Sequence, residues 1–280
     1  IQSHSRAAFL TGDGRVISKV TQGITTEILG EGSTNAPAND KTRSVDRTLP
    51  EHWFFPGERG FDSWLRAMHK HGASANFGSF IGSGTLRAYA KGMAEGEASE
   101  AELDSMRAAV RNAMEDGAFG IASALIYPPN NYSSTRELIE TAKAMAPYGG
   151  VYITHMRSEA DRLLEAIDET IQIGRDGGVP VEIYHLKAAG QRNWPKMKLA
   201  IDKINAARAA GRDVAADMYA YPAGATGLTA CLPPWSQADG KLFANIEDPK
   251  TRARMKAEML RKDVDWENLC DLSTPAGVLI

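Results

Sequence analysis

The sequence has few cysteines and little imbalance of charge, and both scarcities exclude classes of protein. Cys231 and Cys270 are its only cysteines, so it cannot form a disulfide framework and allows at most one bridge. Lys and Arg number 32 and Asp and Glu number 35, which gives a net charge of −3. Without an excess of basic residues to neutralise phosphates, we expect no nucleic-acid partner and no membrane partner.

Long apolar runs and export signals are absent as well. No stretch approaches the roughly 20 apolar residues that a transmembrane helix needs. Residues 1–5 lack the basic and apolar regions of a signal peptide, and we expect a cytoplasmic protein. They also lack an initial Met, which suggests a piece of a longer chain. A hydrophobic content of 43% and a charged content of 24% are those of an ordinary globular protein, which excludes a disordered or fibrous chain.

From about residue 99 onward, predicted helices alternate with short apolar runs. Ser99 with Glu102 and Ser134 with Glu137 are capping boxes, each of which begins an amphipathic helix. The apolar runs are typical of strands buried on both faces, and they span 119–126, 151–154, 181–184 and 213–217. The glycines that end the helices recur every 28 to 33 residues. This period indicates a series of βα units and therefore a parallel sheet.

Upstream of residue 99 the pattern is looser but compatible with the same fold. Two further strands are expected at 25–30 and 75–81, the remnant of another near Ile1, and a long loop over 32–60. No linker divides the chain. The predicted fold class is therefore α/β, a (β/α)8 TIM-type barrel over residues 1–280 that is incomplete, with about seven strands present.

Histidines end two neighbouring predicted strands. His155 follows the strand at 151–154, and His185 follows the strand at 181–184, one βα unit further on. Barrel enzymes place their chemistry at the carboxyl ends of strands, and adjacent strands lie roughly 4.8 Å apart. We expect the two imidazoles to occupy equivalent positions and to share a metal ion.

Cationic side chains follow both histidines at a spacing of two residues. Because residues i and i+2 of a strand share a face, Arg157 is expected beside His155 and Lys187 beside His185. These donors suit the docking of an anionic substrate group. Tyr219 follows Asp217 in the same way at the end of the next strand.

Two earlier residues fit the same site. His4 lies among the first residues, and Glu31 directly follows the strand at 25–30. A carboxylate there can join the ligands of a hard or borderline cation. A Gly-Glu-Gly turn is equally typical of an exposed loop.

Several blocks resemble the D-aminoacylase family, the N-acyl-D-amino-acid deacylases of the amidohydrolase superfamily. The most specific are the blocks Thr-His-Met-Arg-Ser-Glu at 154–159 and His-Leu-Lys-Ala-Ala-Gly at 185–190, and the resemblance runs from about residue 1 to 235. It implies a zinc-dependent barrel that hydrolyses the amide of a small-molecule N-acyl-D-amino acid.

The resemblance also implies roles for single residues. His155 and His185 match the strand-end zinc ligands, and His4 matches the second histidine of a His-x-His motif. Lys187 and Tyr219 match contacts to the substrate carboxylate, and we expect Arg157 to assist them.

The chain departs from the family pattern at three places. Gln2 stands where the first histidine of His-x-His is expected, and Glu31 stands in the block that normally supplies a ligating cysteine. The catalytic aspartate of the family follows an eighth strand, which we expect outside residues 1–280 together with a small β domain. These departures predict one firmly bound zinc ion, a less certain second one, and a catalytic barrel that is a fragment.

Two other functions compete with hydrolysis. The departures at Gln2 and Glu31 are compatible with a non-catalytic relative whose metal site has become a binding pocket. Lys187 at the end of a strand is compatible with a Schiff-base lyase.

Overall fold

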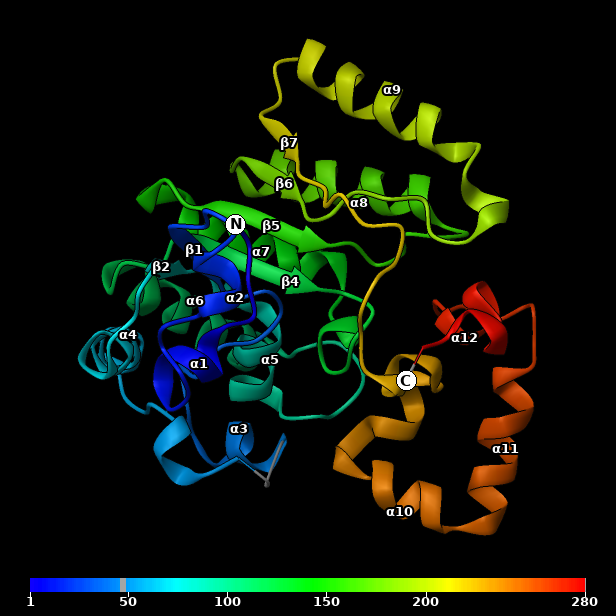
Figure 1. Ribbon diagram of the computed structural model, residues 1–280, viewed down its shortest axis with the longest axis horizontal. Helices are drawn as coiled ribbons and strands as arrows, with labels where there is room; N and C mark the ends of the chain where they lie inside the picture. Colours follow the sequence, from blue (N-terminus) through cyan, green and yellow to red (C-terminus); the bar gives the residue numbers. More distant parts are fainter. Residues whose placement is uncertain (46–48, 280) are drawn as a thin grey trace.

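A computed structural model describes residues 1–45 and 49–279 as a parallel α/β structure (Figure 1). Strand β1 pairs in parallel with β2, and a second parallel sheet has the order β3-β4-β5-β6-β7. The strands are β1 (Thr26–Leu29), β2 (Asn76–Ser79), β3 (Ile81–Gly82), β4 (Gly120–Ala124), β5 (Val151–His155), β6 (Val181–Ile183) and β7 (Val214–Ala216). The predicted α/β class and its parallel strands are confirmed.

The first residues extend the smaller sheet. Gln2 forms a parallel bridge with Ile28 of β1, where a remnant of a strand was expected. Phe80 separates β2 from β3, so one predicted strand contributes to both sheets. Across the described residues the strands do not close into a barrel.

Successive helices cover one face of the larger sheet, and each packs against the next (Figure 1). The capping boxes at Ser99 and Ser134 both form as predicted. These helices are α5 (Ser83–Lys91), α6 (Glu100–Glu115), α7 (Thr135–Met145), α8 (Leu163–Gly177) and α9 (Lys196–Ala209).

The segment that was predicted as one long loop contains short helical pieces. Helix α3 (Asp40–Val45) and the 3-10 turn η1 (Glu51–Trp53) lie in it, and residues 46–48 fall outside the described part. Three more helices precede β2, namely α1 (Arg6–Leu10), α2 (Ile17–Val20) and α4 (Gly60–His71).

Alternation along the strands divides the core into two parts. Ile121, Tyr152 and Val181 are buried toward the helices, where they belong to the main apolar cluster. Ala122 and Ile153 face the other way and form a smaller buried cluster with Phe80 and Tyr184. Because His155 is two residues from Ile153, it lies on the same face as this smaller cluster.

A buried ion pair ties the helical layer together. The Arg87 guanidinium of α5 lies 2.5 Å from the Glu137 carboxylate of α7 and also donates to the carbonyl oxygens of Ala94 and Gly96. Both charged side chains are almost fully buried, at 1% and 4% exposure.

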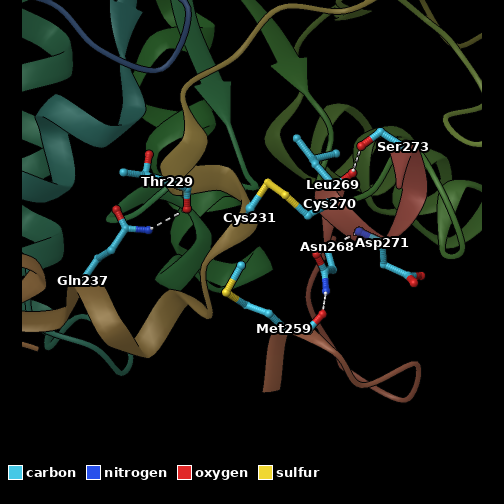
Figure 2. The surroundings of a disulfide bond; sticks show 9 residues. All are labelled: Thr229, Cys231, Gln237, Met259, Asn268, Leu269, Cys270, Asp271 and Ser273. Carbon is cyan, nitrogen blue, oxygen red and sulfur yellow. Dashed lines mark hydrogen bonds between the residues drawn. A yellow bond between two sulfur atoms is a disulfide. The ribbon is translucent and has the colours of Figure 1, made fainter. Parts of the chain in front are cut away.

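Beyond β7 the chain forms 3-10 turns and then a helical extension that we call the C-terminal arm, residues 242–279 (Figure 1). The arm contains α10 (Leu242–Glu247), α11 (Pro249–Met259) and α12 (Leu269–Ser273). A disulfide joins Cys270 of α12 to Cys231 of the turn η5 (Leu228–Cys231), as Figure 2 shows. The one bridge that the composition allowed is therefore formed. None of the helices in the described ranges combines the length and apolarity that crossing a bilayer requires.

Candidate metal centre

The two strand-end histidines meet, but not at equivalent positions. In the β5–β6 ladder, Tyr152 lies opposite Val181 and Thr154 opposite Ile183. His155 is therefore level with Tyr184, so the expected register is wrong by one residue. Alternation alone would then point His185 toward the helices, away from His155.

A backbone turn corrects this offset. His185 adopts a left-handed conformation with φ of 38°, just beyond the end of β6. Its backbone N–H donates to Asp217 Oδ1 at 2.6 Å, which anchors the turn. The ring swings back toward β5, and His185 Nε2 lies 3.1 Å from His155 Nδ1.

Glu31 completes a group of three possible ligands. Its Oε1 lies 3.2 Å from His185 Nε2 and 3.6 Å from His155 Nδ1. Gly30, with φ of 109°, makes the turn that aims this side chain inward, and a Cβ there would lie 2.2 Å from the Phe80 carbonyl oxygen. The Glu31 side chain is only 7% exposed, so the alternative of an exposed Gly-Glu-Gly loop is wrong.

The three atoms suit a metal ion. Their separations of 3.1, 3.2 and 3.6 Å match the spacing of about 3.3 Å between ligands of a tetrahedral zinc ion with bonds near 2.0–2.1 Å. Two imidazole nitrogens and a carboxylate oxygen are also a common donor set for zinc.

The other oxygen of Glu31 faces the first residues of the chain. Glu31 Oε2 accepts a hydrogen bond from Gln2 Nε2 at 2.5 Å and lies 3.3 Å from His4 Nε2. Burial favours a raised pKa for Glu31, but the contacts with His155, His185 and His4 outweigh it and hold that pKa well below its usual range. His4 therefore reaches the centre, although its own side chain is 75% exposed.

Glu159 belongs to the centre and was missed as a site residue. Its carboxylate lies 2.9 Å from His185 Nδ1, 3.8 Å from His155 Nε2 and 2.6 Å from Lys187 Nζ. Burial acts to raise the pKa of Glu159, but the neighbouring histidines and Lys187 outweigh it and lower that pKa to about 2. The signal was available, because Glu159 ends the Thr-His-Met-Arg-Ser-Glu block.

Lys187 and Tyr219 lie near the histidines, and their contact with a substrate stays a prediction. Lys187 Nζ lies 2.9 Å from His185 Nδ1 and 5.5 Å from the centre of the Tyr219 ring. The Tyr219 ring lies 6.2 Å from the His185 ring.

Arg157 is placed differently from the prediction. Its guanidinium pairs with Glu169 of α8 at 2.9 Å and donates to the carbonyl oxygens of Asn131 and Ser133. Strand β5 ends at His155, so the two-residue alternation does not extend to Arg157. Its contact with a substrate stays a prediction.

Parallel strands whose carboxyl ends carry two histidines and a carboxylate define an amidohydrolase-type domain. No family model matches the sequence. The chain is 36% identical over 212 residues to a D-aminoacylase of Alcaligenes xylosoxydans xylosoxydans, an alignment that covers 75% of this chain and 43% of that protein. It is also 34% identical over 236 residues to an N-acyl-D-aspartate deacylase of the same organism, with 81% of this chain and 46% of that protein covered.

The structural comparison agrees. A D-aminoacylase structure is 32% identical with a TM-score of 0.70, and covers 80% of this chain and 47% of its own. Over the residues it spans, the chain belongs to the D-aminoacylase family of amidohydrolases. It spans about half the length of the curated relatives it matches.

Proposed function

We propose that this domain contributes to zinc-dependent hydrolysis of the amide bond of N-acyl-D-amino acids. The observation that carries the proposal is the convergence of His155 Nδ1, His185 Nε2 and Glu31 Oε1 at the carboxyl end of the sheet. The similarity to D-aminoacylase and to N-acyl-D-aspartate deacylase supports the class of substrate.

The residues around the centre have separable roles in this proposal. When bound, zinc supplies an activated water and polarises a carbonyl group. Lys187 offers an ammonium group beside the centre, where it can hold the substrate carboxylate, and Tyr219 offers a hydroxyl nearby. Holding the carboxylate fixes the position and the handedness of the substrate relative to the histidines.

The proton acceptor is proposed to be an aspartate outside residues 1–280, as the family resemblance implies. The domain is then the larger part of a (β/α)8 barrel, and the parallel strands in chain order support this view. Location in the cytoplasm stays a prediction of the sequence.

We also propose that the centre holds one zinc ion. The Gln2 amide donates to Glu31 Oε2, whereas Oε1 is the carboxylate oxygen that lies toward His155 and His185. An N–H donor at this place occupies the oxygen that a second cation would need, and an amide nitrogen is a poor ligand. His4 also lies on that side, and its side chain is 75% exposed.

The test uses the purified full-length protein loaded with zinc. We expect release of D-amino acids from N-acetyl-D-amino acids and none from the L enantiomers, with activity removed by a chelator and restored by zinc. Metal analysis is expected to give one ion per chain. Zinc binding without hydrolysis would favour a binding barrel, and borohydride trapping of a carbonyl substrate on Lys187 would favour a lyase.

A further inference from the structure

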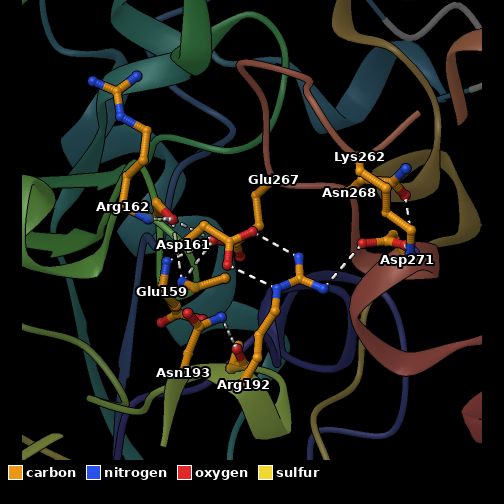
Figure 3. A network of polar contacts seen from close by, with 12 residues as sticks. Glu159, Asp161, Arg162, Arg192, Asn193, Lys262, Glu267, Asn268 and Asp271 are labelled. Carbon is orange, nitrogen blue, oxygen red and sulfur yellow. Dashed lines mark hydrogen bonds and ion pairs between the residues drawn. The ribbon is translucent and has the colours of Figure 1, made fainter. Parts of the chain in front are cut away.

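The C-terminal arm brings a carboxylate of its own to the metal centre. Glu267, which lies between α11 and α12, points toward the segment that follows β5 (Figure 3). Its Oε2 accepts three hydrogen bonds, from Ser158 Oγ at 2.9 Å, from the Glu159 N–H at 2.6 Å and from the Ala160 N–H at 3.1 Å. One oxygen of the arm therefore fixes the backbone turn that carries Glu159.

Glu267 also belongs to a cluster with His155 and Glu159. Ligand atoms of His155, Glu159 and Glu267 lie within 4.8 Å of one another. Over the described ranges of the chain, the buried His155 Nε2 and Glu267 Oε1 have no hydrogen-bond partner. Burying a ring nitrogen without a hydrogen-bond partner costs free energy of folding, so we expect His155 Nε2 to have an acceptor when the centre is complete.

The tautomer of His155 determines whether Nε2 carries a hydrogen that it can donate. In the proposed centre His155 Nδ1 gives its lone pair to zinc, and the neutral ring then carries its hydrogen on Nε2. That nitrogen can donate to a carboxylate but cannot bind a second cation. Metal-binding histidines commonly donate in this way to a carboxylate, which fixes the ring and strengthens the ligand.

We propose that Glu267 is a positioning residue of the metal centre. By holding the turn at 158–160 it aims Glu159 at both histidines, so that the Glu159 carboxylate, 3.8 Å from His155 Nε2, and the Glu267 carboxylate together supply acceptors in the buried space beside that nitrogen. This inference rests on the proposed function only through the metal that His155 would bind.

The attachment of the arm supports this role. Cys270 lies three residues beyond Glu267 and is tied to Cys231 by the disulfide. Arg192 then bridges Asp161, close to the turn, and Asp271 of α12, with contacts of 2.6 and 3.1 Å (Figure 3). The disulfide and the Arg192 ion pairs hold the arm so that Glu267 stays within hydrogen-bonding distance of the turn at 158–160.

The experiment measures zinc affinity in the Glu267→Gln variant by competition with a chromogenic chelator. Glutamine keeps one oxygen for the turn but loses the charge and presents N–H donors where an acceptor is needed. We expect zinc binding to weaken by roughly 10- to 100-fold, the effect that loss of a carboxylate behind a ligating histidine usually has. Glu247→Gln, which alters an exposed carboxylate of the same arm, is the matched control and should bind zinc as the unaltered protein does.

Two further readouts separate positioning from a purely structural role. The thermal midpoint of metal-free Glu267→Gln is expected to stay close to that of the Glu247→Gln control. In cobalt-substituted protein, the visible absorption bands should change in Glu267→Gln and not in the control. Unchanged zinc affinity and unchanged bands in a folded Glu267→Gln protein would overturn the proposal. So would a second bound metal equivalent that this variant loses, because it would make the cluster a cation site.

The zinc affinity of Glu267→Gln and hydrolysis by the unaltered protein are two independent measurements. Zinc affinity is measured without substrate, so the result holds even if the unaltered protein hydrolyses no N-acyl-D-amino acid. Hydrolysis by the unaltered protein together with normal zinc affinity in Glu267→Gln would leave the function standing and remove Glu267 from the centre.

Discussion

The metal centre has two sides that are built in different ways. His155 is the last residue of β5, which pairs with β4 up to this residue, and His185 follows β6 in a turn anchored by the Asp217 carboxylate. Glu267 stands on an arm attached by one disulfide and by ion pairs. The strand side depends mainly on sheet pairing and on the Asp217 anchor, whereas the arm side depends on a few side-chain contacts.

The arm is the less firmly held of the two sides. Arg192 and Asp161 are 47% and 56% exposed, and an exposed ion pair contributes only about 0–1 kcal/mol. Most of the attachment of the arm should therefore come from the disulfide and from packing. Loss of one of these contacts should therefore loosen the arm without unpairing the strands.

The largest expected effect is on the strand side of the centre. His185→Ala removes one of three ligands, and we expect zinc affinity to fall by at least about 1,000-fold, given that full zinc sites are worth roughly 10–16 kcal/mol. Chelator competition measures this loss, with the exposed His69→Ala as control. Zinc retained when both His155 and His185 are replaced would refute the assignment of ligands.

The next effect tests how firmly the helical layer supports the sheet. Arg87→Met leaves the Glu137 carboxylate buried without its partner, and this should cost about 3–5 kcal/mol of unfolding free energy. The double variant Arg87→Met, Glu137→Leu should recover part of the loss, less the cost of the capping box that Glu137 forms with Ser134. Urea unfolding followed by circular dichroism measures both, and equal loss in the single and double variants would contradict the explanation.

A smaller and local effect is expected in the arm. Replacing Cys231 and Cys270 by Ser opens a bridge between residues 39 apart in sequence, which typically costs about 2–4 kcal/mol. We expect faster hydrogen exchange across residues 242–279 while the amides of β4 to β6 keep their protection. Equal loosening of both regions would mean that the arm and the sheet unfold as one unit.

The smallest effect concerns the substrate rather than the fold. Lys187→Ala removes the ammonium group beside the centre, and we expect KM for an N-acyl-D-amino acid to rise roughly 10-fold, the worth of one charge-assisted hydrogen bond. Zinc binding should be retained. Lys203→Ala, which removes a lysine paired with Asp168 on the outer surface, should leave KM unchanged. Loss of zinc from Lys187→Ala would instead make Lys187 part of the support of His185.

The sequence predicted the strands and the two histidines because both follow from local regularity. Apolar runs closed by glycines mark the strands, and a repeat near 30 residues places His155 and His185 on neighbouring ones. Glu31 was recognised by its place after a strand, but its burial depends on the turn at Gly30, which periodicity does not report.

Other features escaped prediction because they depend on contacts between distant segments. The offset at His185 comes from a left-handed backbone that no hydrophobic pattern encodes. Arg157 turns to Glu169 because β5 ends two residues earlier than alternation requires. Glu267 reaches the centre from 108 residues away, through an arm whose polar sequence resembles an ordinary solvated helix.

The carboxylate of Glu31 also affects the sensitivity of the proposed centre to oxidants and its choice of metal ion. A centre made of two imidazoles and one carboxylate contains no sulfur, so peroxide has no thiolate among these ligands to oxidise. An oxygen donor in place of a soft one also widens the choice of metal toward harder ions such as Mn²⁺ and Co²⁺. In the proposed centre, Glu31 would therefore confer resistance to oxidation of the ligands and a wider choice of metal ion than a thiolate would.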